Sequence, residues 1–176
     1  GIARGLGCPN IDVRLRQRDF RGDGADPLLP WLGAAIPELE GQGAFLLIGS
    51  DIRQEQPILA HRIRKAALAG APVVLVNPYE VGLTHPNTQL VSGAARMVED
   101  LAAIAKSLRK RGSGTLKDLI AQAQPTEAHA AIAESLKEAK GLVLLGGLAA
   151  AHPDYTLLKA FAYVIADATK SKVGFL

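Results

Sequence analysis

The sequence predicts an α/β fold in which helices cover both faces of a mainly parallel sheet, and three observations support this prediction. Short, uninterrupted apolar runs at residues 44–48, 73–76 and 142–145 are typical of strands buried on both faces. Segments with apolar residues at helical spacing lie between these runs. The two kinds of segment alternate along the chain, which favours parallel strands joined by helical crossovers.

The first crossover is the best marked. After the strand at 44–48, Pro57 fits the first turn of a helix whose apolar residues share one face. Gly70 ends that helix, and the second strand follows two residues later and closes at Asn77. We therefore expect a right-handed βαβ unit here.

The rest of the chain continues the alternation. A long helix is predicted from about residue 91 to residue 111, and its basic last turn complements the helix dipole. A flexible Gly/Ser joint at 111–114 precedes a short helix over 115–123, and a further helix is predicted over 126–140. After the third strand, Pro153 opens a last helix. The result is a Rossmann-like arrangement.

The pattern predicts three parts. Residues 1–42 form a lead-in segment, 43–111 the first βαβ half, and 112–176 a second half that is truncated at the C-terminus. The closing residues 173–176 resemble a strand that has just begun, so we expect an excised segment of a longer polypeptide.

Composition excludes several classes of function. The single cysteine, Cys8, rules out an intrachain disulfide framework and a four-cysteine iron–sulfur site within this segment. A net charge of only +3 and 5% aromatic residues give no support for a nucleic-acid partner. No apolar run of about 18 residues occurs, so we expect no direct membrane insertion. The four histidines are scattered, and no metal site is predicted.

The candidate binding residues follow the predicted strands. Ligands of open parallel sheets bind beyond the carboxyl ends of the strands, and Gly49, Ser50, Asn77 and Gly146 lie in the loops there. Such glycines could let a phosphate approach the backbone. They could instead serve only to turn the chain sharply into a helix, and we favour this structural alternative. Asp51 also favours the structural alternative, because its carboxylate would repel a phosphate.

An arginine-rich segment is the strongest local charge feature. Arg14, Arg16, Arg18 and Arg21 are candidates for an interface with an acidic protein surface or a phosphate. A solvated surface explains the same pattern equally well.

Many short segments resemble, in order, the large iron–sulfur subunit of bacterial NADH:quinone oxidoreductase, respiratory complex I. The resemblance begins in the stretch that follows the iron–sulfur region of that subunit and extends over its molybdopterin-oxidoreductase-like domain. The segments that carry it are GLG at 5–7, NID at 10–12, RLRQ at 14–17, PWLG at 30–33, LIGS at 47–50, RQEQP at 53–57, AHRIR at 60–64, LLG at 144–146, HP at 152–153 and KVGFL at 172–176.

The resemblance implies a fold shared with molybdenum enzymes such as formate dehydrogenase, whose corresponding loops hold a pterin guanine dinucleotide. This sequence departs from those enzymes at both loops. Asp51-Ile52 stand where they commonly have Asn-Pro, and Asn77-Pro78-Tyr79 stand where they commonly have Asp-Pro-Arg. An anionic residue gained and an arginine lost both disfavour a phosphate. We therefore expect a vestigial, empty pocket, no cofactor in this segment and no catalytic residue.

These features lead to one expected function and two alternatives. The expected function is a cofactor-free scaffold domain in the peripheral arm of the complex that transfers electrons from NADH to quinone. Its iron–sulfur clusters would lie in the parent polypeptide outside this segment, its partners would be the other subunits of complex I, and it would face the cytoplasmic side of the bacterial inner membrane. The alternatives are an active molybdopterin-dinucleotide oxidoreductase domain and a free-standing Rossmann-like nucleotide-binding module.

Overall fold

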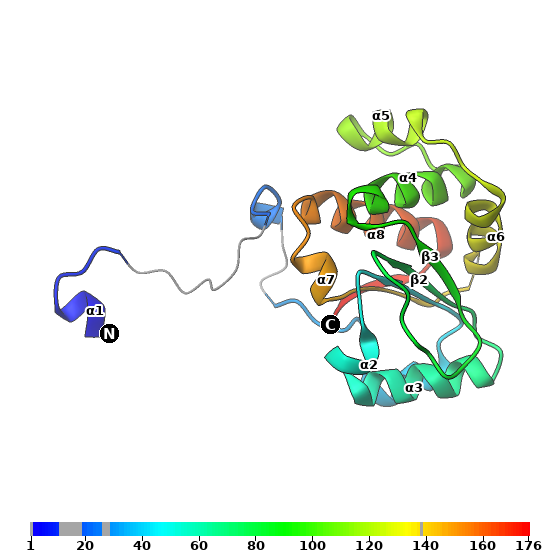
Figure 1. Cartoon of the computed structure of the whole chain (residues 1–176), viewed down its shortest axis with the longest axis horizontal. Helices are drawn as coiled ribbons and strands as arrows, with labels where there is room; N and C mark the ends of the chain where they lie inside the picture. The colour runs from blue at the N-terminus through cyan, green and yellow to red at the C-terminus, as the bar shows by residue number, and fades with distance from the viewer. Residues whose placement is uncertain (1, 11–18, 26–28, 138) are drawn as a thin grey trace.

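The fold is built on one five-stranded, fully parallel sheet with the strand order β3-β2-β1-β4-β5 (Figure 1). The computed structural model describes residues 2–10, 19–25, 29–137 and 139–176. The strands are β1 (Phe45–Ile48), β2 (Val73–Asn77), β3 (Thr88–Val91), β4 (Leu142–Leu145) and β5 (Lys172–Phe175). This confirms the predicted α/β class with a parallel sheet.

Helices cover both faces of the sheet (Figure 1), and they lie between successive strands except β2 and β3, which the helix-free loop 78–87 joins. Helix α3 lies on one face, whereas α4, α6 and α8 lie on the other. The α-helices are α1 (Ile2–Gly5), α2 (Ile52–Glu55), α3 (Pro57–Leu68), α4 (Met97–Ser107), α5 (Gly114–Gln122), α6 (Glu127–Leu136), α7 (Gly147–Ala150) and α8 (Tyr155–Thr169). The 3₁₀ turns are η1 (Asp23–Ala25), η2 (Ile36–Gly41) and η3 (Ala94–Arg96).

The continuous apolar runs make two separate cores because successive strand residues point to opposite faces. Leu46 and Ile48 of β1 pack with α4 and α8, whereas Phe45 and Leu47 pack with α3. All four β1 side chains are fully buried. The apolar runs of the three central strands are therefore uninterrupted, as a sheet covered on both faces requires.

The strand order reverses at β1, which places a switch point at its carboxyl end. From β1 the chain crosses to β2 and β3 on one side, and later to β4 and β5 on the other. The pairing register aligns Ile48 with Val76 and with Leu145, so the loops after these three strands meet at one edge. In doubly wound sheets, this edge is where ligands bind.

The helix predicted over about residues 91–111 is shorter at both ends, and α4 ends at Ser107. Val91, predicted to begin a long helix, ends the edge strand β3, and α4 begins only at Met97. Strand β3 is half-exposed and lacks the apolar run that marks the buried strands. Gly93, with a φ of 76°, separates the strand from the turn that leads into α4.

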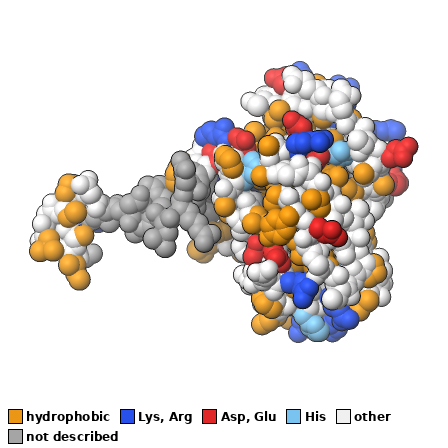
Figure 2. Space-filling view, viewed as in Figure 1, with side chains coloured by type: hydrophobic (Ala, Val, Ile, Leu, Met, Phe, Trp, Pro, Cys, Tyr) orange, Lys and Arg blue, Asp and Glu red, His pale blue; other side chains and the backbone are white. Residues whose placement is uncertain are grey.

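Surface charge is mixed. Figure 2 shows acidic and basic side chains interspersed over the visible face, without a field of one sign. Within the described ranges, no helix combines the length and apolarity needed to cross a bilayer.

Candidate functional site

The structure brings the four predicted binding residues together at the carboxyl edge of the sheet. Ser50 and Asn77 are fully buried, and their groups bond each other directly. The Ser50 amide donates to Asn77 Oδ1 (2.9 Å), and Asn77 Nδ2 donates to the Ser50 carbonyl (2.8 Å). The Asn77 side chain thus ties the loop after β1 to the end of β2. Its amide is already used within the chain.

The two glycines permit a close contact between the loops after β1 and β4. The amide of Ala149 donates to the carbonyl of Gly49 (3.0 Å). A Cβ on Gly49, which has a φ of 58°, would lie 2.4 Å from the Ala149 nitrogen, and one on Gly146 would lie 2.4 Å from Ser50 Cβ. Both glycines are therefore required by packing between the loops at the switch point.

We use "strand-end cradle" for Gly49, Ser50, Asn77, Gly146 and the backbone amides beside them. Glu55, which was not among the predicted binding residues, places its carboxylate in this cradle. The Glu55 carboxylate accepts hydrogen bonds from Ser50 Oγ (2.9 Å), the Asp51 amide (3.1 Å) and the Gly147 amide (3.2 Å). Glu55 and Gly147 are 92 residues apart, so no local sequence pattern marks their contact.

These residues do not fit a phosphate-bearing pterin dinucleotide. Backbone amides at the ends of parallel strands are the usual donors to a phosphate. Here two of those amides and a serine hydroxyl bond a carboxylate of the chain itself. A second anion in the cradle would face the fixed charge of Glu55 at close range.

The neighbouring hollow is no better suited to a phosphate. A hollow of about 440 Å³ adjoins the cradle and is lined by two carboxylates, Asp51 and Glu80, and one arginine. That arginine, Arg53, already donates to the backbone carbonyl of Gly82. The two carboxylates outnumber the one arginine, so the hollow as a whole carries negative charge that would repel a phosphate.

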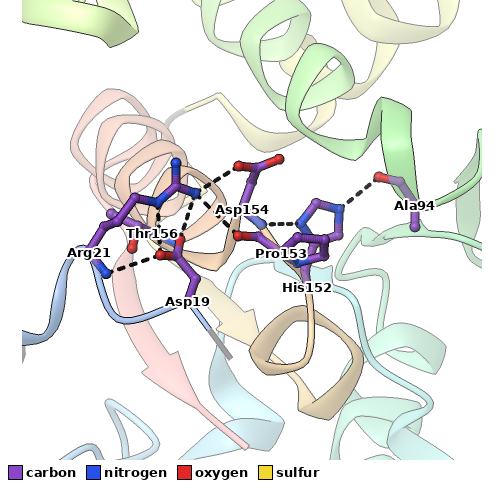
Figure 3. Close-up of polar contacts among 7 residues, drawn as sticks. All are labelled: Asp19, Arg21, Ala94, His152, Pro153, Asp154 and Thr156. Atoms are coloured by element: carbon purple, nitrogen blue, oxygen red, sulfur yellow. Dashed lines mark hydrogen bonds and ion pairs between the residues drawn. The ribbon is translucent and has the colours of Figure 1, made fainter. Parts of the chain in front are cut away.

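The arginine-rich segment is only partly described. Arg14, Arg16 and Arg18 lie outside the described residues. Arg21 forms a bidentate pair with Asp19, through Nε (2.8 Å) and Nη2 (2.9 Å), as Figure 3 shows. Its Nη2 also pairs with Asp154 Oδ1 (2.7 Å). Arg21 therefore joins the lead-in segment to the start of α8, and its role at an interface stays a prediction.

Asp19 is the buried centre of this cluster. Its side chain is 2% exposed and also accepts a hydrogen bond from the Thr156 amide (2.9 Å). The Arg21 guanidinium holds the pKa of the Asp19 carboxyl far below its usual range, and this outweighs burial, which alone would raise it. The residue is therefore ionised throughout the physiological range.

Two histidines are buried, and both have structural partners. His129 Nδ1 accepts from the Thr126 amide (3.0 Å) at the start of α6, and Nε2 lies 3.1 Å from Asp100 Oδ1. His152 Nδ1 accepts from the Asp154 amide (2.9 Å), and Nε2 lies 2.9 Å from the Ala94 carbonyl (Figure 3). Because each Nδ1 accepts a backbone N–H, Nε2 carries the proton and donates.

In the part of the chain that the structure describes, no three His, Cys, Asp or Glu side chains gather closely enough to hold a metal ion. The hydrogen bonds of the clusters at Asp19 and His129 join elements of the fold: the lead-in to α8, and α4 to α6.

Comparison with known proteins gives a family and a fold. No curated protein sequence matches this chain. A chain of the formyltransferase/hydrolase complex FhcABCD from Methylorubrum extorquens, solved with methylofuran, is similar in structure, with a TM-score of 0.53 and 15% identity over 83% of this chain. The match covers 39% of that chain, so the sequence spans well under half its length. Residues 10–174 match the molybdopterin oxidoreductase family, and the chain belongs to that family.

Proposed function

We propose that this chain is a cofactor-free scaffold domain of the large iron–sulfur subunit of NADH:quinone oxidoreductase. The proposal that the domain binds no cofactor rests on the Glu55 carboxylate, which accepts hydrogen bonds from the cradle amides that a phosphate would use. The ordered segments that resemble that subunit support the assignment to the complex. Family membership supports the origin of the domain from a cofactor-binding oxidoreductase.

Covalent attachment and three hydrogen bonds favour the internal carboxylate of Glu55 over an external phosphate. Glu55 is covalently part of the chain, so placing it in the cradle costs far less entropy than binding a free dinucleotide. Removing it would require three donors, including the Ser50 hydroxyl, to find other partners. The domain would then contribute its surface and its stability to the assembly, and the redox groups would lie elsewhere in the parent polypeptide.

The solved structure that this fold resembles is itself a chain of a multi-protein complex. A place within an assembly, with partners among the other subunits at the cytoplasmic side of the bacterial inner membrane, is part of the same proposal.

The test measures cofactor content and assembly separately. The complete parent protein, purified from its source, is analysed for molybdenum and tungsten by mass spectrometry and for pterin by fluorescence after oxidation. We expect both to be far below one per polypeptide. A stoichiometric metal with pterin would establish the active molybdopterin enzyme instead. Binding of NAD, ATP or GTP to the chain at sub-millimolar concentration, measured by calorimetry, would establish the nucleotide-binding module.

Assembly supplies the positive result that a scaffold requires. Asn77→Ala in the parent polypeptide is expected to lower the amount of assembled NADH:quinone oxidoreductase in the membrane, because it weakens the fold. The turnover of each assembled complex, normalised to its iron–sulfur content, should stay unchanged. Lower turnover at unchanged assembly would contradict a scaffold role.

A further inference from the structure

A basic hollow lies on the opposite side of α4 from the sheet. Helix α5 packs on α4 outside the three main layers (Figure 1), and a hollow of about 480 Å³ lies between its residues and the C-terminal end of α4. Its apolar lining includes Ile120 and Ala121, and no carboxylate is among its described lining residues. We call this hollow the basic groove, after the cations that line it: Lys106, Arg109, Lys110, Arg111 and Lys117.

Two of these cations have fixed structural partners. Lys106 Nζ donates to the carbonyls of Ala121 (2.8 Å) and Ala123 (2.7 Å), which end α5. Lys110 Nζ pairs with Asp167 of α8 (2.6 Å). The Lys110–Asp167 pair is charge-neutral, whereas Lys106 keeps its formal charge because its partners are carbonyls.

The other three cations are uncommitted. Among the described residues, the side chains of Arg109, Arg111 and Lys117 have neither a hydrogen bond nor an ion pair. Like charges gathered around one hollow repel each other, and an anion bound among them would relieve that repulsion.

The backbone turn at Arg109 positions this residue beside the groove. Arg109 has a φ of 61°, at the position after α4 where glycine is the usual residue. Helix α4 ends in a Schellman motif: the amide of Arg109 donates to the Lys106 carbonyl (2.9 Å), and that of Lys110 donates to the Ala105 carbonyl (3.0 Å). This turn places Arg109 among the lining residues of the basic groove and of a second hollow.

A second hollow extends the surface. It measures about 470 Å³, shares Arg109 with the basic groove, and is also lined by Lys170 and by Lys137, which pairs with a carboxylate of the same hollow, Glu134 (3.5 Å). Lys170 too has a positive φ, of 55°. The two hollows together exceed what a single phosphate would fill.

We infer that the basic groove binds a carboxylate-rich, amphipathic segment of a partner protein. The uncommitted cations are complementary to carboxylates, and the exposed Ala121 and the aliphatic stems of the cations offer contact to apolar side chains. Gly112 and Gly114, which both have positive φ, turn the chain from the end of α4 into α5 beside the groove. This surface lies away from the strand-end cradle and does not depend on the cradle being empty.

The test uses the whole chain and a fluorescein-labelled peptide of alternating glutamate and leucine pairs. Binding is followed by fluorescence anisotropy at low and at physiological ionic strength. We expect saturable binding that weakens with salt. The double variant Arg111→Glu/Lys117→Glu should weaken it by at least about tenfold. Both side chains are exposed and unpaired in the described structure, so the variant should fold, which circular dichroism checks.

A charge-matched control separates the groove from general electrostatics. Arg4→Glu/Arg64→Glu changes the net charge equally, and neither residue lines the groove. This control should bind within about twofold of the unaltered chain. Arg109→Gly should weaken peptide binding while raising the melting temperature, a combination that a purely structural arginine would not give.

The remaining outcomes overturn the inference. No binding, or equal weakening by the groove variant and the control variant, would show that no specific site exists. Displacement of the peptide by an equimolar amount of pyrophosphate would indicate a small-anion site instead. Groove-dependent binding to phosphatidylglycerol vesicles, with none to the peptide, would indicate a membrane-surface contact.

Discussion

Replacing Asn77 with alanine tests whether this predicted binding residue stabilises the fold through its two hydrogen bonds to the Ser50 backbone. The change removes the acceptor of the Ser50 amide (2.9 Å) and the donor to the Ser50 carbonyl (2.8 Å). Ser50 is fully buried, so both backbone groups would lose their partners away from water. Each unsatisfied group costs about 1–3 kcal/mol, so we expect a loss of about 2–5 kcal/mol in the free energy of unfolding.

The measurement is urea unfolding followed by circular dichroism. The midpoint should fall with an unchanged m-value, and the melting temperature should drop by about 5–15 °C for a chain of this size. Asn87→Ala is the matched control. Its side chain also makes two hydrogen bonds, but it is only half-buried, so we expect a loss below about 1 kcal/mol. If Asn77→Ala lowers the free energy of unfolding by no more than Asn87→Ala does, the stabilising role assigned to Asn77 is refuted.

Three further predictions concern the cradle, the lead-in segment and the basic groove. Gly49→Ala should destabilise the chain by at least about 2 kcal/mol in urea unfolding, because its φ is 58° and the new Cβ would lie 2.4 Å from the Ala149 nitrogen; a neutral result would contradict the close contact between the loops. The Asp19 carboxyl has its pKa lowered in the folded chain, so its contribution to stability is complete above its ordinary pKa of about 4 and is lost as the pH falls below that value. Asp19→Asn should accordingly lower stability at pH 7 and flatten the acid side of the stability–pH profile, and an unchanged acid side would contradict the role assigned to Asp19. Arg109→Gly should raise stability by about 1 kcal/mol through relief of the left-handed backbone, as thermal unfolding would record, and a lower stability would show that the arginine side chain supports the fold.

Much of the fold could be predicted because the relevant signals are local. The buried strands β1, β2 and β4 are continuous apolar runs, and helix α3 begins at a proline, Pro57, and ends before a glycine, Gly70. The edge strand β3 could not be predicted in this way. Only one of its sides meets another strand, so its sequence needs no apolar run and can be as polar as a loop.

For the candidate site, the placement of the residues could be predicted from the sequence, but their role could not. Gly49, Ser50, Asn77 and Gly146 could be placed together from the sequence, because parallel strands bring their carboxyl ends to one edge. The function of these residues could not be read from that placement. Whether Asn77 faces a ligand or the Ser50 backbone depends on distances between separate loops.

The sequence by itself determined the fold class, the doubly covered sheet and the edge at which its loops converge. Strand burial and helix amphipathicity depend on the pattern of apolar residues that are close together in the sequence, so they can be predicted from it. Only the tertiary structure decided that Glu55 enters the cradle, that Asp19 joins the lead-in to α8, and that the cations around Arg109 line one groove. Those contacts join separate elements of the fold, and no local period in the sequence encodes which of them meet.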